Sequence, residues 1–531
     1  MSETTLIAEN ARLKKHIQKQ KALIAELEEK VELLQLLHFG SKSEKLTVED
    51  KKQAGLFNEA EDAAFEQHDT EQQEAVAQKR EVGAYIRRKS SRKAGRKPLS
   101  PDLPREIQEY DIPEEDKECV CGTEKTCIGY DSSERAKIIP ARVVVVQERR
   151  KKYVCKTCEG TTADEKGVQT AVGPKHVIGR SIADESLLAW SIHEKFDYAL
   201  PLYRQAKRLH QIGIPIPRAT LGNVIIKSAF ACKPIYEGLQ KSIQSGPVIN
   251  ADETPVQVLK EPGRKAKDKS WMWVFAGGQT GKESVLFHYD SSRSHTVAYD
   301  FLTDYTGWLQ TDDYEAYHTA VKKIRAQRKN GEIIRHVLCW AHVRRKFYKY
   351  WELSKSEEAK QVLDHIKELF RLEELRDDFS LKGFLKHRKN RAGPLLEQLR
   401  KLLFRFAAEV PPGLSFGKAI AYTLDNWEQL LLYLENPLLT PSNNRAENAI
   451  RPFVIGRKNW MFSGTPTGAQ SSAILYSLVE SAKLHKLPVY EYFYYILKKI
   501  PYCSTQKDYE ALLPFNLTPE IIKIFSDGGK N

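Results

Sequence analysis

The chain has few cysteines and no long apolar run. Eight cysteines among 531 residues are too sparse for a disulfide scaffold. The N-terminal stretch MSETTLIAENARLKK lacks the apolar core of a signal peptide, and no run of about 18 apolar residues is free of charge. These absences argue against a disulfide-rich secreted domain and against a membrane protein. We therefore expect a soluble, cytoplasmic protein with no membrane partner.

Acidic residues are outnumbered by basic ones. Lys and Arg total 83 against 70 Asp and Glu, which gives a formal net charge of +13 and a pI near 9.1. Such an excess favours a polyanionic partner, and nucleic acid is the first candidate. A chain of this length is also long enough for several domains.

Heptad spacing marks the first part of the chain. Mostly apolar residues recur every seven positions in two interleaved series, Leu6, Leu13, Gln20, Leu27 and Leu34, and Asn10, Ile17, Ile24 and Val31. β-Branched residues at a, leucine at d and a single Asn at a are typical of a parallel two-stranded coiled coil. A single amphipathic helix packed on its own protein is the alternative. The pattern predicts a homo-oligomer, at least a dimer.

The charge changes sign after the heptads. Residues 59–74 are acidic and Gln-rich, which is the composition of a linker, whereas residues 79–97 are strongly basic. The basic stretch is either a solvated charge run or an extended arm that follows DNA phosphates. The residues of the candidate arm that we expect to contact DNA are Arg87, Arg88, Arg92, Lys93, Arg96 and Lys97.

Four of the cysteines form two close pairs. Cys119 and Cys121 lie in CVCGTEKTC, and Cys155 and Cys158 lie in CKTCEG, after a stretch that predicts a strand, ARVVVVQERRKKYVC. Four thiolates in two pairs predict a structural Zn²⁺ site, which would stabilise a module too small for a large core. The first pair is separated by one residue where two to four are usual, so Cys127 is a rival ligand. Four unrelated buried thiols are the alternative.

The remaining chain alternates between helical and mixed patterns. Residues 181–245 predict helices on both sides of the turn IPIPRAT, either as a DNA-binding helix-turn-helix or as ordinary helical packing. From residue 247 the pattern is α/β, with a three-strand meander, a helical segment near 293–304 and a fourth strand in GWLQTDDYEAY. A further strand in EIIRHVLCW runs into a helix. Residues 353–436 are charged and helical throughout, which predicts a helical insertion in the α/β unit.

Three carboxylates in this α/β unit form the candidate catalytic site. Asp252 lies in the first strand, where an ionised carboxylate is costly unless something compensates it. Asp312 ends the fourth strand, and the two meet if these strands are neighbours. Carboxylates at strand ends suit hard cations such as Mg²⁺. Glu447, on a helix predicted in PSNNRAENAIRPFVIGRKNW, supplies the third ligand for two metals about 3.5–4 Å apart.

Each carboxylate has a structural alternative. Asp252 could be a strand-end turn acid, Asp312 could cap the next helix, and Glu447 could pair with Arg451 at i, i+4. Basic residues beside the three carboxylates favour the functional interpretation, because cations must offset the charge of a phosphate substrate. The basic residues expected to contact DNA here are Arg344, Arg345, Lys346, Arg451, Arg457 and Lys458.

Sequence blocks along almost the whole chain resemble the transposases of the insertion-sequence-66 family. They include LHFGSKSEKL, GRKPLSPDLPR, YALPLYRQAKRL, ADETPVQVL, LQTDDYEAY, CWAHVRRKFY and NNRAENAIRPFVIGRKNWMFSG. The resemblance implies a retroviral-integrase-like (ribonuclease H-like) catalytic domain in which Asp252, Asp312 and Glu447 are the catalytic carboxylates. It also implies that the helical stretch between the last two is the insertion domain of the family.

The motifs depart from the family at one catalytic position. Asp313 stands where the family usually has Gly, so Asp312 is the metal ligand by its position in the motif and Asp313 is the alternative. Cys339 and His342 in CWAHVRRKFY are a family feature, which we interpret as a packing or DNA-positioning pair because two ligands do not close a zinc site.

These observations predict a multidomain α/β transposase. Two Mg²⁺ (or Mn²⁺) ions per active site would serve cleavage of double-stranded DNA at the element ends and strand transfer to target DNA, with element-encoded accessory proteins as possible partners. The alternatives are a structure-specific ribonuclease H-like nuclease and a catalytically inactive dimeric DNA-binding protein. The predicted parts are a coiled coil (1–46), a linker and arm (47–100), a zinc module (101–165), a helical DNA-binding or connecting region (166–245), the catalytic domain (246–352 and 437–480), the helical insertion (353–436) and a C-terminal helical region (481–531).

Overall fold

The structure, a computed structural model, describes residues 144–154, 168–328 and 333–526 and a few helical positions near the N-terminus. Those positions include Ile17, Ile24 and Val31, which are predicted to occupy position a of the heptads. Their side chains are about half exposed. The chain divides into two compact units, one of residues 70–173 and the other of the remaining residues.

The described part of the smaller unit is a short antiparallel hairpin. Its strands are β1 (Lys152–Val154) and β2 (Val168–Thr170), with Tyr153 opposite Gln169. The strand expected from residue 141 onward is therefore much shorter than predicted. Residues 144–146, which are all Val, precede it without strand structure and are exposed.

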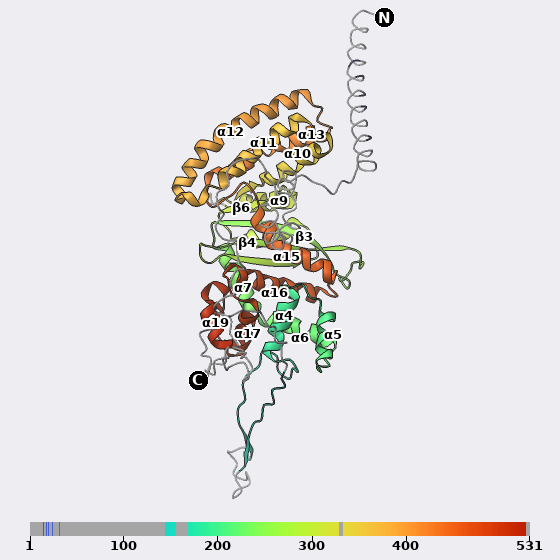
Figure 1. Ribbon diagram of the computed structural model, residues 1–531, viewed down its shortest axis with the longest axis vertical. Helices are drawn as coiled ribbons and strands as arrows, with labels where there is room; N and C mark the ends of the chain where they lie inside the picture. Colours follow the sequence, from blue (N-terminus) through green and yellow to red (C-terminus); the bar gives the residue numbers. More distant parts are fainter. Residues whose placement is uncertain are drawn as a thin grey trace, which may run out of the picture. The chain divides into compact units, whose positions relative to one another are not determined.

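A five-stranded mixed sheet forms the centre of the larger unit (Figure 1). Its strand order is β5-β4-β3-β6-β7. The first three strands along the chain are antiparallel neighbours, and β6 and β7 run parallel to β3. This confirms the predicted meander and the pairing of the first strand with the fourth. The strands are β3 (Val248–Gln257), β4 (Lys269–Gly277), β5 (Ser284–Asp290), β6 (Trp308–Thr311) and β7 (Arg335–Leu338).

Helices from distant parts of the chain cover the sheet. On one face Phe301 stacks on Phe275 and Tyr317 contacts Trp273 edge-on; on the other, Phe453 contacts Phe287. Successive residues of a strand point to opposite faces of the sheet. Phe287 pairs with Val274, which lies between Trp273 and Phe275 in β4, so Phe287 is on the opposite face from those two aromatic residues. The helices concerned are α8 (His295–Leu302) and α9 (Glu315–Gln327) on the first face and α15 (Asn444–Trp460) on the second.

The free edge of β5 is covered by α16 (Pro466–Leu484). The backbone N–H of Val285 donates to Ser481 Oγ at 3.0 Å, and that of Phe287 donates to Ser477 Oγ at 2.7 Å. These hydroxyls satisfy edge groups that would otherwise be available to pair with another chain.

The helices predicted over residues 181–245 are present and pack with the C-terminal helices. In Figure 1 they lie with α16 and α17 on the side of the sheet away from α12. α6 buries Leu221 and Ile225, as the packing alternative predicts, and α5 exposes Arg204 and Lys207. DNA recognition by these helices stays a prediction. The helices are α4 (Glu185–Phe196), α5 (Leu202–Gln211), α6 (Arg218–Ala231), α7 (Lys233–Gln244), α17 (Val489–Lys499), η5 (Ile500–Tyr502), α18 (Gln506–Glu510), η6 (Pro514–Asn516) and α19 (Pro519–Ser526).

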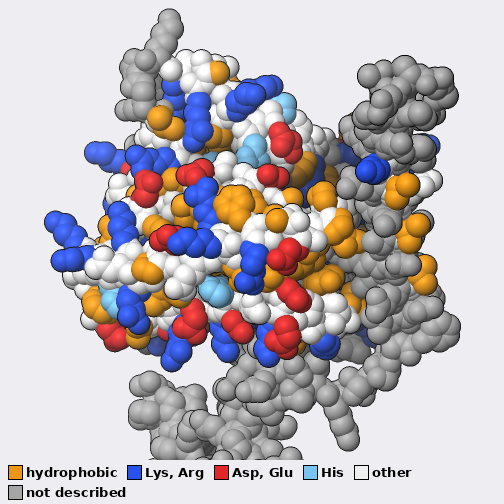
Figure 2. Space-filling view, turned by 90° about the horizontal axis from the view of Figure 1, so that it is seen from above, with side chains coloured by type: hydrophobic (Ala, Val, Ile, Leu, Met, Phe, Trp, Pro, Cys, Tyr) orange, Lys and Arg blue, Asp and Glu red, His pale blue; other side chains and the backbone are white. Residues whose placement is uncertain are grey.

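Residues 353–436, all of which the structure describes, are mainly helical and share a second hydrophobic core with α10 and strand β7. The buried guanidinium of Arg388 donates to the carbonyls of Tyr433 (2.9 Å) and Leu439 (2.8 Å) and to Glu373 (2.8 Å), which ties this layer to the segment before α15. Figure 2 looks onto this end of the unit and shows Lys and Arg side chains interspersed with Asp and Glu. The helices are α10 (Trp340–Ser354), α11 (Glu357–Glu373), η3 (Arg376–Asp378), α12 (Leu381–Glu409), α13 (Ser415–Asp425), α14 (Trp427–Leu431) and η4 (Leu432–Glu435).

Candidate active site

Strand β3 sends its two acidic residues to opposite faces of the sheet. Glu253 lies opposite Trp273, on the α8 and α9 face, and its carboxylate accepts hydrogen bonds from Arg293 Nη2 (2.5 Å) and the Tyr317 hydroxyl (2.6 Å). Asp252 lies on the other face of the sheet. Its Oδ1 accepts a hydrogen bond from the backbone N–H of Glu253 at 2.9 Å. The charge of Glu253 is therefore compensated within the protein, and that of Asp252 is not.

A buried amide network holds β3, β6 and the start of α15 together. The side-chain amide of Asn250 donates to Gln310 Oε1 and to Asn443 Oδ1, both at 3.0 Å. Asn443 in turn donates to the Ala251 carbonyl at 2.9 Å, and Gln310 donates to the Thr440 carbonyl at 2.7 Å. These partners leave few orientations open, so the network fixes how α15 starts on the sheet.

The spacing of this network brings the carboxylates to one level. Asp252 comes two residues after Asn250, about 6.6 Å along a strand, and Glu447 comes four residues after Asn443, about 6 Å along a helix. Asp312 likewise comes two residues after Gln310, the partner of Asn250 across β3 and β6. The three amide side chains form one layer between β3, β6 and the start of α15, and the three carboxylates form the layer that follows it along these elements.

The two consecutive aspartates after β6, Asp312 and Asp313, have different hydrogen-bond partners. Asp312 Oδ1 accepts the backbone N–H of Tyr314 at 3.1 Å, a partial form of the helix-capping role. Asp313 instead accepts from Asn426 Nδ2 at 3.0 Å and lies 2.7 Å from His318 Nε2. Asp313 is thus engaged by α9 and by the helical layer.

The surroundings of Asp252 and Glu447 disfavour their negative charge. Burial, followed by the negative charges of Glu253, Glu447 and Asp312, raises the pKa of Asp252 well above its usual value. Burial also raises the pKa of Glu447, although Arg345 and Arg451 oppose the shift. Oxygen ligands that repel one another in this way are a donor set that fits hard divalent cations.

Glu447 also lies beside two side chains of α10. Its Oε2 is 3.7 Å from Arg345 Nη2, and its Oε1 is 3.8 Å from His342 Nδ1. Among the described residues, a group of metal-ligating side chains whose ligand atoms all lie within 4.8 Å of one another is formed by Cys339, His342 and Glu447. Burial and Arg345 lower the pKa of His342 to about 4, so its imidazole is neutral at neutral pH.

The basic residues near the carboxylates differ in their surroundings. Arg344 is 3% exposed, and burial lowers its pKa to about 10, so we no longer consider it a candidate for DNA contact. The Lys346 ammonium lies 4.1 Å from the Tyr422 ring centre. Arg457 donates to Thr254 Oγ1 at 3.0 Å, and Lys458 is exposed.

Several predicted site residues lie outside the described residues. They are the zinc-module cysteines Cys119, Cys121, Cys155 and Cys158, their rival Cys127, and the arm residues Arg87, Arg88, Arg92, Lys93, Arg96 and Lys97.

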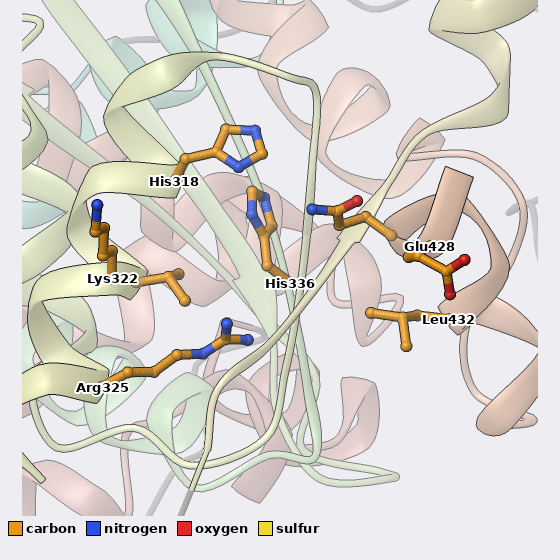
Figure 3. Close-up of a pocket in the computed structure, with 8 residues that line it drawn as sticks. His318, Lys322, Arg325, His336, Glu428 and Leu432 are labelled. Atoms are coloured by element: carbon orange, nitrogen blue, oxygen red, sulfur yellow. The ribbon is translucent and has the colours of Figure 1, made fainter. Parts of the chain in front are cut away.

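A cavity of about 520 Å³ lies beside the site, between α9 and the α14–η4 segment (Figure 3). His318, Lys322 and Arg325 from α9 form one wall, and Glu428 and Leu432 face them. The cavity adjoins Asp313 through His318, and its lining does not include the three carboxylates. It is therefore a neighbouring feature and not the candidate active site.

The amide network was missed by the sequence interpretation. Its signal is a repeated spacing, a polar amide two residues before each aspartate, in NAD and QTD, and one four residues before Glu447, in NNRAE. Asn and Gln in strands predicted to be buried require partners, and these three are partners of one another.

Four family descriptions match the chain. Residues 180–471 match "Transposase IS66 family", residues 26–107 "Transposase C of IS166 homeodomain", residues 116–159 "zinc-finger binding domain of transposase IS66", and residues 477–515 "IS66 C-terminal element". These matches identify the chain as a transposase. The chain belongs to the IS66 family, which confirms the resemblance found in the sequence, and the zinc-finger match spans all four paired cysteines.

The chain is also similar to uncharacterized proteins of a bacterium. The uncharacterized protein y4jD of Sinorhizobium fredii is 32% identical over 423 residues, covering 78% of this chain and 81% of the relative. The uncharacterized protein y4qI of the same organism is 29% identical over 532 residues, covering 97% and 93%. No solved structure matches the chain. None of the described helices has the length and apolar character needed to cross a membrane.

Proposed function

We propose that this transposase cleaves DNA at the ends of an insertion sequence and transfers the freed 3′-hydroxyl to target DNA, with Asp252, Asp312 and Glu447 as its catalytic residues. The observation that supports the proposal is the buried amide network that joins β3, β6 and the start of α15, together with the repulsion of Asp252 by the nearby charges of Glu447 and Asp312.

The sheet supports a ribonuclease H-like fold for the catalytic domain. A three-strand antiparallel meander is followed by two strands parallel to its first member, with helices on both faces. This topology explains how Asp252 and Asp312, 60 residues apart in sequence, meet across neighbouring strands.

The three carboxylates would hold two Mg²⁺ or Mn²⁺ ions. When bound, the metals supply activation of the attacking oxygen and neutralisation of phosphate charge, so no covalent enzyme intermediate is needed. Asp252 and Asp312 are fixed on adjacent strands, and Glu447 is fixed by the first turn of α15. Compensation of Glu253 by Arg293 and Tyr317 keeps that neighbouring carboxylate away from the metals.

The proposed DNA contacts surround these carboxylates. Arg345 and Lys346 lie on α10, beside Glu447. Arg451, Arg457 and Lys458 lie on α15, the helix that carries Glu447. Such contacts would position the DNA backbone. We extend the proposal to the basic arm, to a structural Zn²⁺ held by the paired cysteines and to dimerisation through the heptads. Two DNA ends must be brought together for transposition, and a dimer supplies two active sites.

The test is gel-resolved cleavage of labelled end DNA with Mg²⁺, beside a binding titration at the same salt concentration. Asp252→Asn and Asp312→Asn keep side-chain shape and remove charge, so each should abolish cleavage and leave DNA binding intact, because affinity comes mainly from Lys and Arg contacts. Asp313→Asn is the matched control and should retain most activity. Full cleavage by either of the first two variants would contradict the assignment.

The same assay separates a transposase from a nuclease. Pre-cleaved end DNA with a free 3′-hydroxyl should be joined to a target plasmid by the wild-type protein. Hydrolysis of end DNA without any joined product would favour the structure-specific nuclease.

A further inference from the structure

A second set of ligands converges next to the carboxylates. Cys339 precedes α10, His342 lies in the first turn of α10, and Glu447 lies in the first turn of α15. The Sγ, imidazole and carboxylate ligand atoms of the three all lie within 4.8 Å of one another. Sequence alone gave only two of these ligands, because Glu447 is more than 100 residues away.

Two atoms of this set lack the partner that burial requires. His342 Nδ1 and Glu447 Oε1 are both buried and make no hydrogen bond, and they face each other at 3.8 Å. Buried polar atoms are nearly always satisfied, so two unsatisfied atoms directed at the same point indicate an absent ligand between them. An imidazole nitrogen and a carboxylate oxygen bound to one tetrahedral ion would be about 3.4 Å apart, close to the observed separation.

We propose that Cys339, His342 and Glu447 form a binding site for a transition-metal ion of the Zn²⁺ class. Thiolate, imidazole and carboxylate together suit Zn²⁺ or Co²⁺ and do not suit Mg²⁺, which selects oxygen ligands. With three protein ligands the ion keeps one position for water or a DNA oxygen, unlike the closed site expected of the paired cysteines.

The backbone around the three ligands holds them in place without the ion. The Asn443 N–H donates to Cys339 Sγ at 3.2 Å, which fixes the position of the sulfur. The next residue, Trp340, donates its N–H to the Pro441 carbonyl at 2.7 Å. The starts of α10 and α15 are therefore bonded to each other directly, and metal binding needs only side-chain adjustment.

Occupation of this site would withdraw Glu447 from the catalytic metals. This consequence rests on the proposed function, whereas metal binding itself does not. Zn²⁺ should therefore inhibit Mg²⁺-dependent cleavage, and the inhibition should depend on Cys339, a residue that the catalytic proposal does not use.

The first experiment counts bound zinc in full-length, reduced protein titrated with Zn²⁺ alone. Cys339→Ser keeps an acceptor for the Asn443 N–H but is a poor zinc ligand, so it should bind one equivalent per chain less than the wild type. His342→Gln, at a partly exposed position, should lose the same equivalent. The control is Cys232→Ser, another buried thiol, which should bind as much as the wild type. Equal zinc content in all four proteins would overturn the proposal.

The second experiment measures cleavage of end DNA in Mg²⁺ with increasing Zn²⁺. Wild type and Cys232→Ser should be inhibited at concentrations at least ten-fold lower than Cys339→Ser. Identical inhibition curves would overturn the competitive role of the site. If the wild type cleaves no DNA under any condition, the proposed function fails, but the zinc count still decides whether the site exists.

Discussion

Substitution of Asp252 by Asn should stabilise the metal-free protein. Burial and the charges of Glu253, Glu447 and Asp312 raise the pKa of Asp252 well above its usual value. When folding raises the pKa of a carboxyl group, the folded protein is most stable at pH values below the unfolded pKa, about 3.9. Its free energy of unfolding then falls as the pH rises from the unfolded pKa through the folded pKa. At neutral pH the raised pKa of Asp252 therefore lowers the free energy of unfolding, and Asn removes this penalty while keeping the shape.

The expected gain is about 1–3 kcal/mol, the usual cost of a buried polar group without a partner. In a unit of this size that corresponds to a rise in Tm of a few degrees. The gain should be present at pH 7 in EDTA and should disappear as the pH is lowered to the unfolded pKa of the carboxyl, about 3.9. The assay is thermal unfolding of both proteins over this pH range.

Mg²⁺ should reverse the order of stability. A ligand at about 100 times its Kd stabilises the folded state by about 2.7 kcal/mol, and this term should appear for the wild type and not for Asp252→Asn. Asp313→Asn is the control and should not raise Tm, because Asp313 already interacts with His318 and Asn426. A lower Tm for Asp252→Asn at pH 7 in EDTA would refute the reasoning and indicate a structural acid.

Two further predictions concern residues away from the carboxylates. Asn443→Ala leaves buried amide partners unsatisfied, so it should cost about 1–3 kcal/mol in urea unfolding and reduce cleavage more than DNA binding; equal losses of both would argue against a positioning role. Replacing Cys155 and Cys158 together by Ser should remove one equivalent of zinc by elemental analysis, and unchanged zinc would exclude this pair as ligands.

The sequence was sufficient to predict the sheet and the candidate carboxylates because both follow from local patterns. Alternating or continuous apolar runs identified the strands of the large sheet, and motif position identified Asp252, Asp312 and Glu447. The preference for Asp312 over Asp313 also came from the motif. The structure adds a physical reason, since Asp313 is held by His318 and Asn426.

Features that depend on distant segments were not predictable. Arg293 neutralises Glu253 from 40 residues away, and no spacing rule identifies this pair. Arg344 looked like a surface cation in a basic run, but its position on α10 points it into the core. The Val run at residues 144–146 has strong strand propensity yet forms no strand, because propensity alone does not supply a pairing partner.

Cleavage of labelled end DNA by Glu447→Gln in Mg²⁺ tests the central claim most directly, because Glu447 connects α15 to the carboxylate pair on the sheet. The variant keeps the size and shape of the side chain, removes its charge and replaces one acceptor oxygen by an amide donor. We predict that cleavage and strand transfer are lost while binding to end DNA at the same salt concentration is unchanged. Wild-type cleavage by this variant would contradict the three-carboxylate site.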